Sequence, residues 1–189
     1  MSIEQYLEME KASPVRHEYI RGCVFAITDA TDAHNKIGGR IFSLLNLRLK
    51  TTGWTVYKSE MKVRIEEPNV FYYPDLMVTN EQYVPTSLFK TSPTLIVEIL
   101  SPATANIDRR EKLANYGSIP SLREYLMFHQ HKPLAELYRK NEKTWNSSET
   151  FKAEDTVIIE SLPGESFQLQ LEELYHGVWP TIVLPEALI

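Results

Sequence analysis

The segment Leu95-Ile96-Val97-Glu98-Ile99-Leu100 constrains the fold of this chain more than any other part of the sequence. Its nearly continuous apolar character is typical of a central β-strand that is buried on both faces. Glu98 interrupts the run, and an ionised carboxylate in a dry core costs several kcal/mol unless it is paired or bound to a metal. The segment therefore predicts a buried sheet and leaves two roles open for Glu98, a structural partner of an arginine or a metal ligand.

Helical and strand patterns alternate irregularly along the rest of the chain, which favours a mixed sheet flanked by helices over a doubly wound one. Helices are predicted at 2–12, at about 104–116, at 169–177, and before Gly53, where one face carries Ile37, Ile41, Leu44, Leu45 and Leu49. A hairpin is predicted at 18–28, turning at Arg21-Gly22, and strands at 54–58, 61–66, 74–79, 94–100, 124–129, 134–140 and 156–161. We expect a single α/β domain spanning 1–189, with an N-terminal helix and β-hairpin.

The composition is that of a soluble globular protein, with 43% hydrophobic and 24% charged residues among 189. No apolar run approaches the roughly 18 residues that a membrane span needs. The N-terminal MSIEQYLEMEKASP carries charges where a signal peptide needs an apolar stretch. Cys23 is the single cysteine, so an intrachain disulfide is impossible. These features predict a cytoplasmic protein without membrane contact.

A formal net charge of −5 argues against a protein that coats nucleic acid nonspecifically, because phosphate binding favours a basic surface. It does not exclude a nuclease, since a metal site needs clustered carboxylates and a local basic groove can coexist with an acidic whole. The sequence has no Gly-rich phosphate loop, no Cys/His zinc spacing and no G-x-S-x-G motif.

Asp75 is the second carboxylate that stands out. It follows Pro74 and opens the apolar strand Leu76-Met77-Val78. Taken alone, it is an ordinary acidic residue at the start of a strand. Asp75 becomes a stronger candidate for a functional carboxylate because Glu98 lies toward the end of the next predicted strand. Two carboxylates at the ends of adjacent strands could share a divalent cation, and magnesium takes oxygen ligands at about 2.1 Å.

The helix that follows Glu98 carries the third feature. Asp108, Lys112 and Tyr116 are spaced by four, so they share one helix face. An acid four residues before a lysine is also a common surface pair, worth roughly 0.2–0.5 kcal/mol. The alternative is that Lys112 points back over the strand ends toward Glu98, and the spacing alone does not decide between the two.

These segments together resemble a known family. RHEYIRG, DATDAHNKI, YYPDLMV, LIVEILSPATANIDRREKLANYG and REYLMF occur in the order seen in the Uma-type restriction endonuclease family of the PD-(D/E)XK nuclease superfamily. The resemblance covers about 2–140 and is most specific at 93–125. It implies a restriction-endonuclease-like fold, with a central mixed sheet and helices on both sides.

The resemblance also implies roles for individual residues. Asp75 and Glu98 match the metal ligands of the superfamily, which usually has a lysine two residues after the glutamate. Here that position is Leu100, and Lys112 on the helix is the matching lysine. We expect it to be a surface lysine whose loss barely affects folding. Glu18 matches an accessory ligand or water-holding position, or is a hairpin-edge glutamate.

The activity expected from the resemblance is metal-assisted hydrolysis of phosphodiester bonds in DNA. Mg²⁺, with Mn²⁺ as a substitute, would be held by Asp75, Glu98 and the Ile99 carbonyl, and Lys112 would orient water or stabilise the transition state. Accessory candidates are Glu18, His34, Asp108 and Tyr116, of which His34, at a predicted helix start, is more typical of a cap or structural donor than of a base.

Two rival interpretations remain open. A non-catalytic DNA-binding or scaffold protein that retains the nuclease fold is favoured by the missing in-strand lysine and by the acidic net charge. The other is a dimeric module that becomes active only with a partner. We expect the protein to form a homodimer.

Overall fold

The computed structural model describes residues 1–27, 30–102, 104–141 and 144–179. Its main layer is a six-stranded sheet in the order β11-β10-β9-β8-β6-β3. Its strands are β3 (Thr55–Lys58), β6 (Leu76–Thr79), β8 (Leu95–Leu100), β9 (Glu124–His129), β10 (Ala135–Arg139) and β11 (Glu149–Phe151). β8 and β9 are parallel and the other pairs are antiparallel, so the predicted mixed sheet is confirmed. All of β8 is buried, as its apolar sequence predicts.

A second sheet stands beside this layer and has the order β2-β1-β5-β4-β7. Its strands are β1 (His17–Ile20), β2 (Cys23–Ala26), β4 (Lys62–Ile65), β5 (Val70–Tyr72) and β7 (Phe89–Lys90). The segment 61–66 is therefore a strand, but it belongs to this sheet and not to the central one. A small two-stranded sheet consists of β12 (Thr156–Ile159) and β13 (Phe167–Gln170).

The N-terminal helix and hairpin form as predicted. α1 (Ile3–Ala12) begins after Ser2, whose hydroxyl accepts a hydrogen bond from the Gln5 backbone amide. The β1–β2 turn lies at Arg21 and Gly22, with φ angles of 51° and 97°. Glycine adopts this left-handed conformation without steric cost, which explains the turn at Gly22. Thr28, the predicted end of the hairpin, lies outside the described residues.

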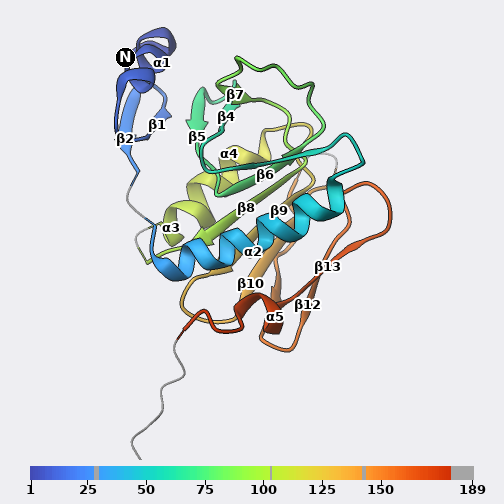
Figure 1. The fold of residues 1–189 in the computed structure, drawn as a ribbon. Helices are drawn as coiled ribbons and strands as arrows, with labels where there is room; N and C mark the ends of the chain where they lie inside the picture. Colours follow the sequence, from blue (N-terminus) through green and yellow to red (C-terminus); the bar gives the residue numbers. More distant parts are fainter. Residues whose placement is uncertain (28–29, 103, 142–143, 180–189) are drawn as a thin grey trace, which may run out of the picture.

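Helices cover both faces of the six-stranded sheet (Figure 1). α2 (Asp32–Leu49) lies on one face, where α5 (Leu171–Tyr175) also packs. Of the helix predicted at 169–177, the first two residues belong to β13, and the helix begins at 171. α3 (Ala105–Ile107), the π-helix η1 (Asp108–Lys112) and α4 (Leu113–Gly117) cover the other face. The predicted continuous helix at 104–116 is therefore interrupted by a π-helical turn, of a kind often found at functional sites.

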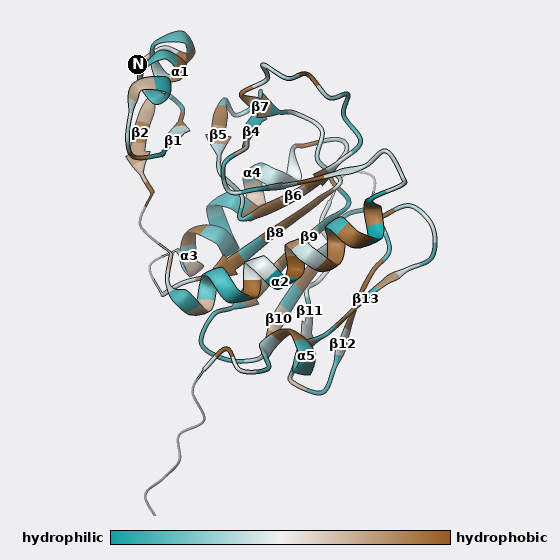
Figure 2. Ribbon diagram, in the orientation of Figure 1, coloured by the Kyte–Doolittle hydropathy of each residue, from teal (hydrophilic) through white to brown (hydrophobic). Residues whose placement is uncertain are grey.

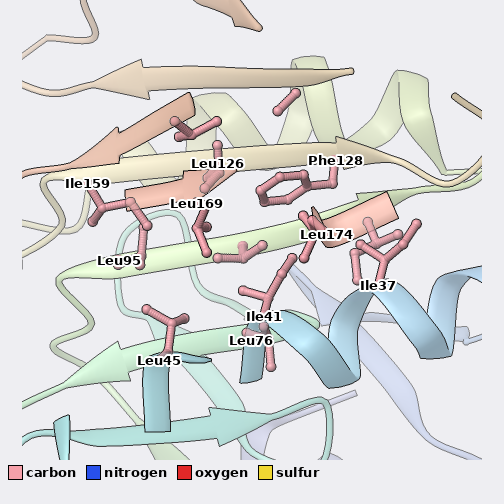
Figure 3. Close-up of a cluster of buried hydrophobic side chains, with 14 of the residues drawn as sticks. Ile37, Ile41, Leu45, Leu76, Leu95, Leu126, Phe128, Ile159, Leu169 and Leu174 are labelled. Atoms are coloured by element: carbon pink, nitrogen blue, oxygen red, sulfur yellow. The ribbon is translucent and has the colours of Figure 1, made fainter. Parts of the chain in front are cut away.

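The apolar stripe of α2 packs against the sheet (Figures 2 and 3). The buried members are spaced by four, namely Ile37, Ile41, Leu45 and Leu49. The prediction that Leu44 shares this face is wrong, because Leu44 is 44% exposed. It precedes Leu45 by one residue, which turns its side chain about 100° away from the stripe.

Close approach of α2 to β8 gives a first testable expectation. A Cβ added at Gly38 would meet Ile99 Cδ1 at 2.9 Å, whereas one added at Gly39 would meet nothing within 4 Å. Alanine at either position gains roughly 1 kcal/mol of helix propensity. Gly38→Ala must also overpack the core, at a cost of about 1–3 kcal/mol. We therefore expect Gly38→Ala to be less stable than Gly39→Ala in urea unfolding. Equal stabilities would mean that the Ile99 side chain moves aside at no cost in free energy.

Candidate active site

Glu98 projects from the centre of the main sheet toward η1 and α4. Side chains alternate along a strand. Accordingly, Val97 and Ile99 pack in the cluster with α2, while Ile96 and Leu100 pack in the cluster with Tyr116 on the opposite face. Glu98 shares the face of Ile96 and Leu100, and its side chain is buried. The position two residues after Glu98, for which the resemblance implied a lysine, therefore lies on the face of Glu98, but Leu100 occupies it.

Asp75 lies next to Glu98 because β6 and β8 are hydrogen-bonded neighbours, with Leu76 opposite Val97. The Asp75 backbone amide donates to Glu98 Oε2 at 3.3 Å. The Ile99 backbone amide donates to Asp75 Oδ2 at 2.7 Å. The predicted pairing of the two strands is confirmed, and one short hydrogen-bonded loop joins the three residues predicted as metal ligands.

Lys112 reaches the same point from the helical side. Its Nζ lies 3.1 Å from Glu98 Oε1, 3.2 Å from Glu18 Oε1 and 3.3 Å from Asp108 Oδ1. Lys112 thus points toward Glu98, as one of the two alternatives from the sequence requires. The expectation of a surface lysine is wrong, because Lys112 is only 6% exposed. Its loss would leave buried carboxylates without their cation.

Tyrosine side chains complete this part of the site. The Tyr116 hydroxyl donates to Glu98 Oε1 at 2.9 Å, which brings this accessory candidate into contact with the glutamate. Tyr72 was not predicted; its hydroxyl donates to Glu111 Oε1 at 2.7 Å, and the ammonium of Lys112 lies 5.5 Å from its ring centroid. Glu111 comes three residues after Asp108, so the helical spacing indicates that Glu111 lies on the same side of the helix as Asp108.

His34 holds Asp75 from the side of α2. Thr31 caps this helix and accepts a hydrogen bond from the His34 backbone amide at 3.2 Å, so the cap is threonine and not His34. The His34 ring nitrogen Nε2 lies 3.0 Å from Asp75 Oδ1. Burial lowers the pKa of His34, but the hydrogen bond and charge of Asp75 outweigh it and the net pKa is raised. The geometry is that of a structural partner of Asp75.

Burial and the excess of negative charge shift the pKa values of Glu98 and Lys112. Burial raises the pKa of Glu98 well above its usual value; Lys112 opposes this, while Asp108 and Asp75 add to it. Burial lowers the pKa of Lys112, but Glu98 and Glu18 outweigh it, so the net pKa is raised. Burial is the largest cause for Glu98, whereas for Lys112 the surrounding carboxylates together outweigh burial. Asp75 thus contributes to the raised pKa of Glu98, although burial contributes more.

A cavity of about 530 Å³ opens onto this cluster. Its polar floor includes Glu18, His34, Asp75, Glu98, Asp108 and Lys112. Its mouth includes the apolar side chains Val15, Phe25 and Ile107, all of which are exposed. The volume is within the range of roughly 300–1,000 Å³ typical of ligand pockets.

The donor set suits a hard cation that remains open to solvent and substrate. Asp75, Glu98 and the Ile99 backbone offer oxygen ligands. Asp108 Oδ1 is buried and accepts no hydrogen bond within the described residues, although Lys112 Nζ is close. The same residues contain no group of three or more His, Cys, Asp or Glu side chains arranged to hold a metal. Asp75 and Glu98 would therefore have to hold a cation as a pair of carboxylates, together with waters and substrate phosphates, a ligand set that magnesium can use.

Among the described residues, no helix is both long and apolar enough to cross a membrane. The cytoplasmic location, the homodimer and the single domain over 1–189 stay predictions.

Comparison with known proteins gives consistent matches. The family model Uma2, described as "Putative restriction endonuclease", matches residues 3–172. Protein sll1609 of Synechocystis sp. is 31% identical over 149 residues, covering 77% of this chain and 84% of that protein. Protein slr1290 of the same organism is 29% identical over 179 residues, covering 94% and 93%. Both are described as uncharacterized.

One solved structure shares the fold. A crystal structure from Anabaena variabilis, titled as a putative nuclease belonging to DUF820, superposes with a TM-score of 0.78. The match covers 95% of this chain and 99% of that one, at 16% sequence identity. At this identity the likeness shows the fold alone.

Proposed function

Because the chain belongs to the Uma2 family of restriction endonuclease-like proteins, we propose that it is a metal-dependent endonuclease that hydrolyses phosphodiester bonds in DNA. The family and the fold support a nuclease-like hydrolase. The observation that carries the proposal is the setting of Glu98, a buried carboxylate at a cavity floor that contacts both Asp75 and Lys112. A purely structural glutamate would be expected to have its charge balanced by cations and hydrogen-bond donors, rather than to lie among several other carboxylates.

Asp75, Glu98 and the Ile99 carbonyl would hold Mg²⁺, or Mn²⁺ in its place, which would supply a bound water of lowered pKa and neutralise charge on the phosphate. Hydrolysis forms one bond from the water oxygen to phosphorus, with the proton of that water released to solvent. It breaks the bond to the leaving oxygen, which takes up a proton from solvent. Lys112 presents a cation at this point, where it can orient the water or stabilise the charge of the transition state.

Neighbouring groups hold the acidic side chains in place before substrate arrives. The Ile99 amide and His34 fix the two oxygens of Asp75. Tyr116 and Lys112 both donate to one oxygen of Glu98, and its other oxygen contacts the Asp75 amide only at 3.3 Å. Such supporting hydrogen bonds orient metal ligands and raise their affinity. The weakly held oxygen of Glu98 is the one best able to take a further ligand.

The direct test is cleavage of supercoiled plasmid and short oligonucleotides with Mg²⁺ or Mn²⁺. We expect nicking that EDTA abolishes and that Asp75→Ala lowers by at least about a hundredfold, the loss typical of one preorganised electrostatic group. In parallel, millimolar Mg²⁺ should raise the melting temperature of the wild type, by mass action on the native state, and leave Asp75→Ala unmoved. A wild type that cleaves nothing and binds no metal would support the non-catalytic DNA-binding or scaffold alternative.

A further inference from the structure

The β1–β2 hairpin places an aromatic ring beside the acidic floor of the cavity. Glu18 on β1 pairs directly with Phe25 on β2, and cross-strand partners project from the same face of a sheet. The adjacent pair, Tyr19 and Val24, faces the other way and packs in the cluster with Tyr6. Because Glu18 lies 3.2 Å from the ammonium of Lys112, the register fixes Phe25 at the cavity and away from the core.

Phe25 has the setting of a ligand-contacting residue. Its side chain is 52% exposed although it lines the cavity. Val15 and Ile107 are also exposed at the same mouth. The three exposed apolar side chains line one cavity, and such a gathering is typical of binding sites, whereas isolated exposed apolar residues need no explanation. The cavity therefore combines an apolar mouth with a charged floor.

Electrostatic attraction alone contributes little to the affinity of this cavity for a nucleic acid. Its floor carries more carboxylates than cations, and the whole chain has a net charge of −5. Attraction between phosphates and basic side chains, the usual source of affinity, is therefore weak here. Stacking of a base on an aromatic ring is independent of net charge and is worth about 1–3 kcal/mol per base.

We propose that Phe25 stacks on an unpaired nucleobase of the substrate, so that the site prefers a single-stranded or frayed segment to continuous duplex. This inference rests on the nuclease function proposed above and adds its substrate class. Bases inside a duplex are already stacked on their neighbours and must be extruded before they can contact a protein ring. A cavity of about 530 Å³ has room for one nucleotide and not for a double helix.

The test compares binding to strands with and without bases. Fluorescence anisotropy would use a short labelled oligodeoxythymidine, an abasic strand of equal length and a blunt duplex, in Ca²⁺, with strand integrity checked on a gel. We expect Phe25→Ala to weaken binding of the oligodeoxythymidine about tenfold, to leave the abasic strand and duplex unchanged, and Phe25→Tyr to keep wild-type affinity. Tyr83→Ala is the matched control, because Tyr83 is an aromatic residue that is 70% exposed and does not line the cavity.

Each outcome separates the inference from the function on which it rests. If the wild type cleaves DNA and Phe25→Ala binds and cuts every strand as the wild type does, stacking is overturned while the nuclease function stands. If Phe25→Ala instead converts a dimer into a monomer in sedimentation, the ring belongs to an interface between copies and the inference is also overturned. A wild type that neither binds nor cuts nucleic acid overturns both.

Discussion

Replacing Lys112 with methionine should lower the free energy of unfolding by about 3–5 kcal/mol, the usual cost of removing one partner from a buried ion pair. The ammonium of Lys112 contacts Glu98, Glu18 and Asp108, and its side chain is almost fully buried. Methionine retains much of the apolar stem, so the loss reports the missing charge more than missing contacts.

The measurement is urea unfolding followed by circular dichroism, with Lys36→Met as the control. Lys36 is a half-exposed lysine that pairs with Asp32 four residues away on α2, so its replacement should cost at most about 0.5 kcal/mol. Adding Glu98→Gln to Lys112→Met should recover part of the loss, because one of the stranded charges is removed. If Lys112→Met is as stable as the control, water relieves the carboxylates and the cluster is not held by this cation.

The elements that could be predicted are those with enough residues to show a pattern. β8 has six residues without a break in burial, and α2 has 18 residues with a four-residue repeat. β5, β7 and β11 have three, two and three residues, too few for an alternating pattern to emerge. Their existence depends on neighbouring strands, and so does the placement of β4 in the second sheet.

The acids of the site could be predicted from the sequence, but the burial of Lys112 could not. Asp75 and Glu98 interrupt apolar strands, which marks them in the sequence. An acid four residues before a lysine gives the same pattern on a surface helix as in a buried cluster, so only the packing of η1 over β8 shows that Lys112 is enclosed. The two-residue turn at Arg21-Gly22 fixes the pairing of Phe25 with Glu18, but the sequence alone does not show that this face of the hairpin meets the acidic cluster.

Glu98→Gln should separate catalysis from folding. The amide is isosteric and neutral, so it removes a buried charge, and its oxygen can still accept hydrogen bonds from Lys112 and Tyr116. Its amino group would face the Asp75 amide, a modest repulsion at a 3.3 Å contact. These opposed effects should leave the free energy of unfolding within about 1–2 kcal/mol of the wild type. Cleavage should fall at least about a hundredfold, and Mg²⁺ should no longer raise the melting temperature.

Glu124→Gln is the control that makes this result specific. Glu124 is also a buried glutamate, on the adjacent strand β9, but it accepts from Arg139 and from the backbone amides of Glu160 and Ser161 and does not line the cavity. Its replacement should cost about 1–3 kcal/mol of stability, since it weakens charge-assisted hydrogen bonds, and should leave the cleavage rate of the folded protein unchanged. A Glu98→Gln variant that cleaves normally would remove Glu98 from the mechanism. One that loses stability as Glu124→Gln does, with cleavage retained, would make it a structural ion-pair partner, the alternative that the sequence left open.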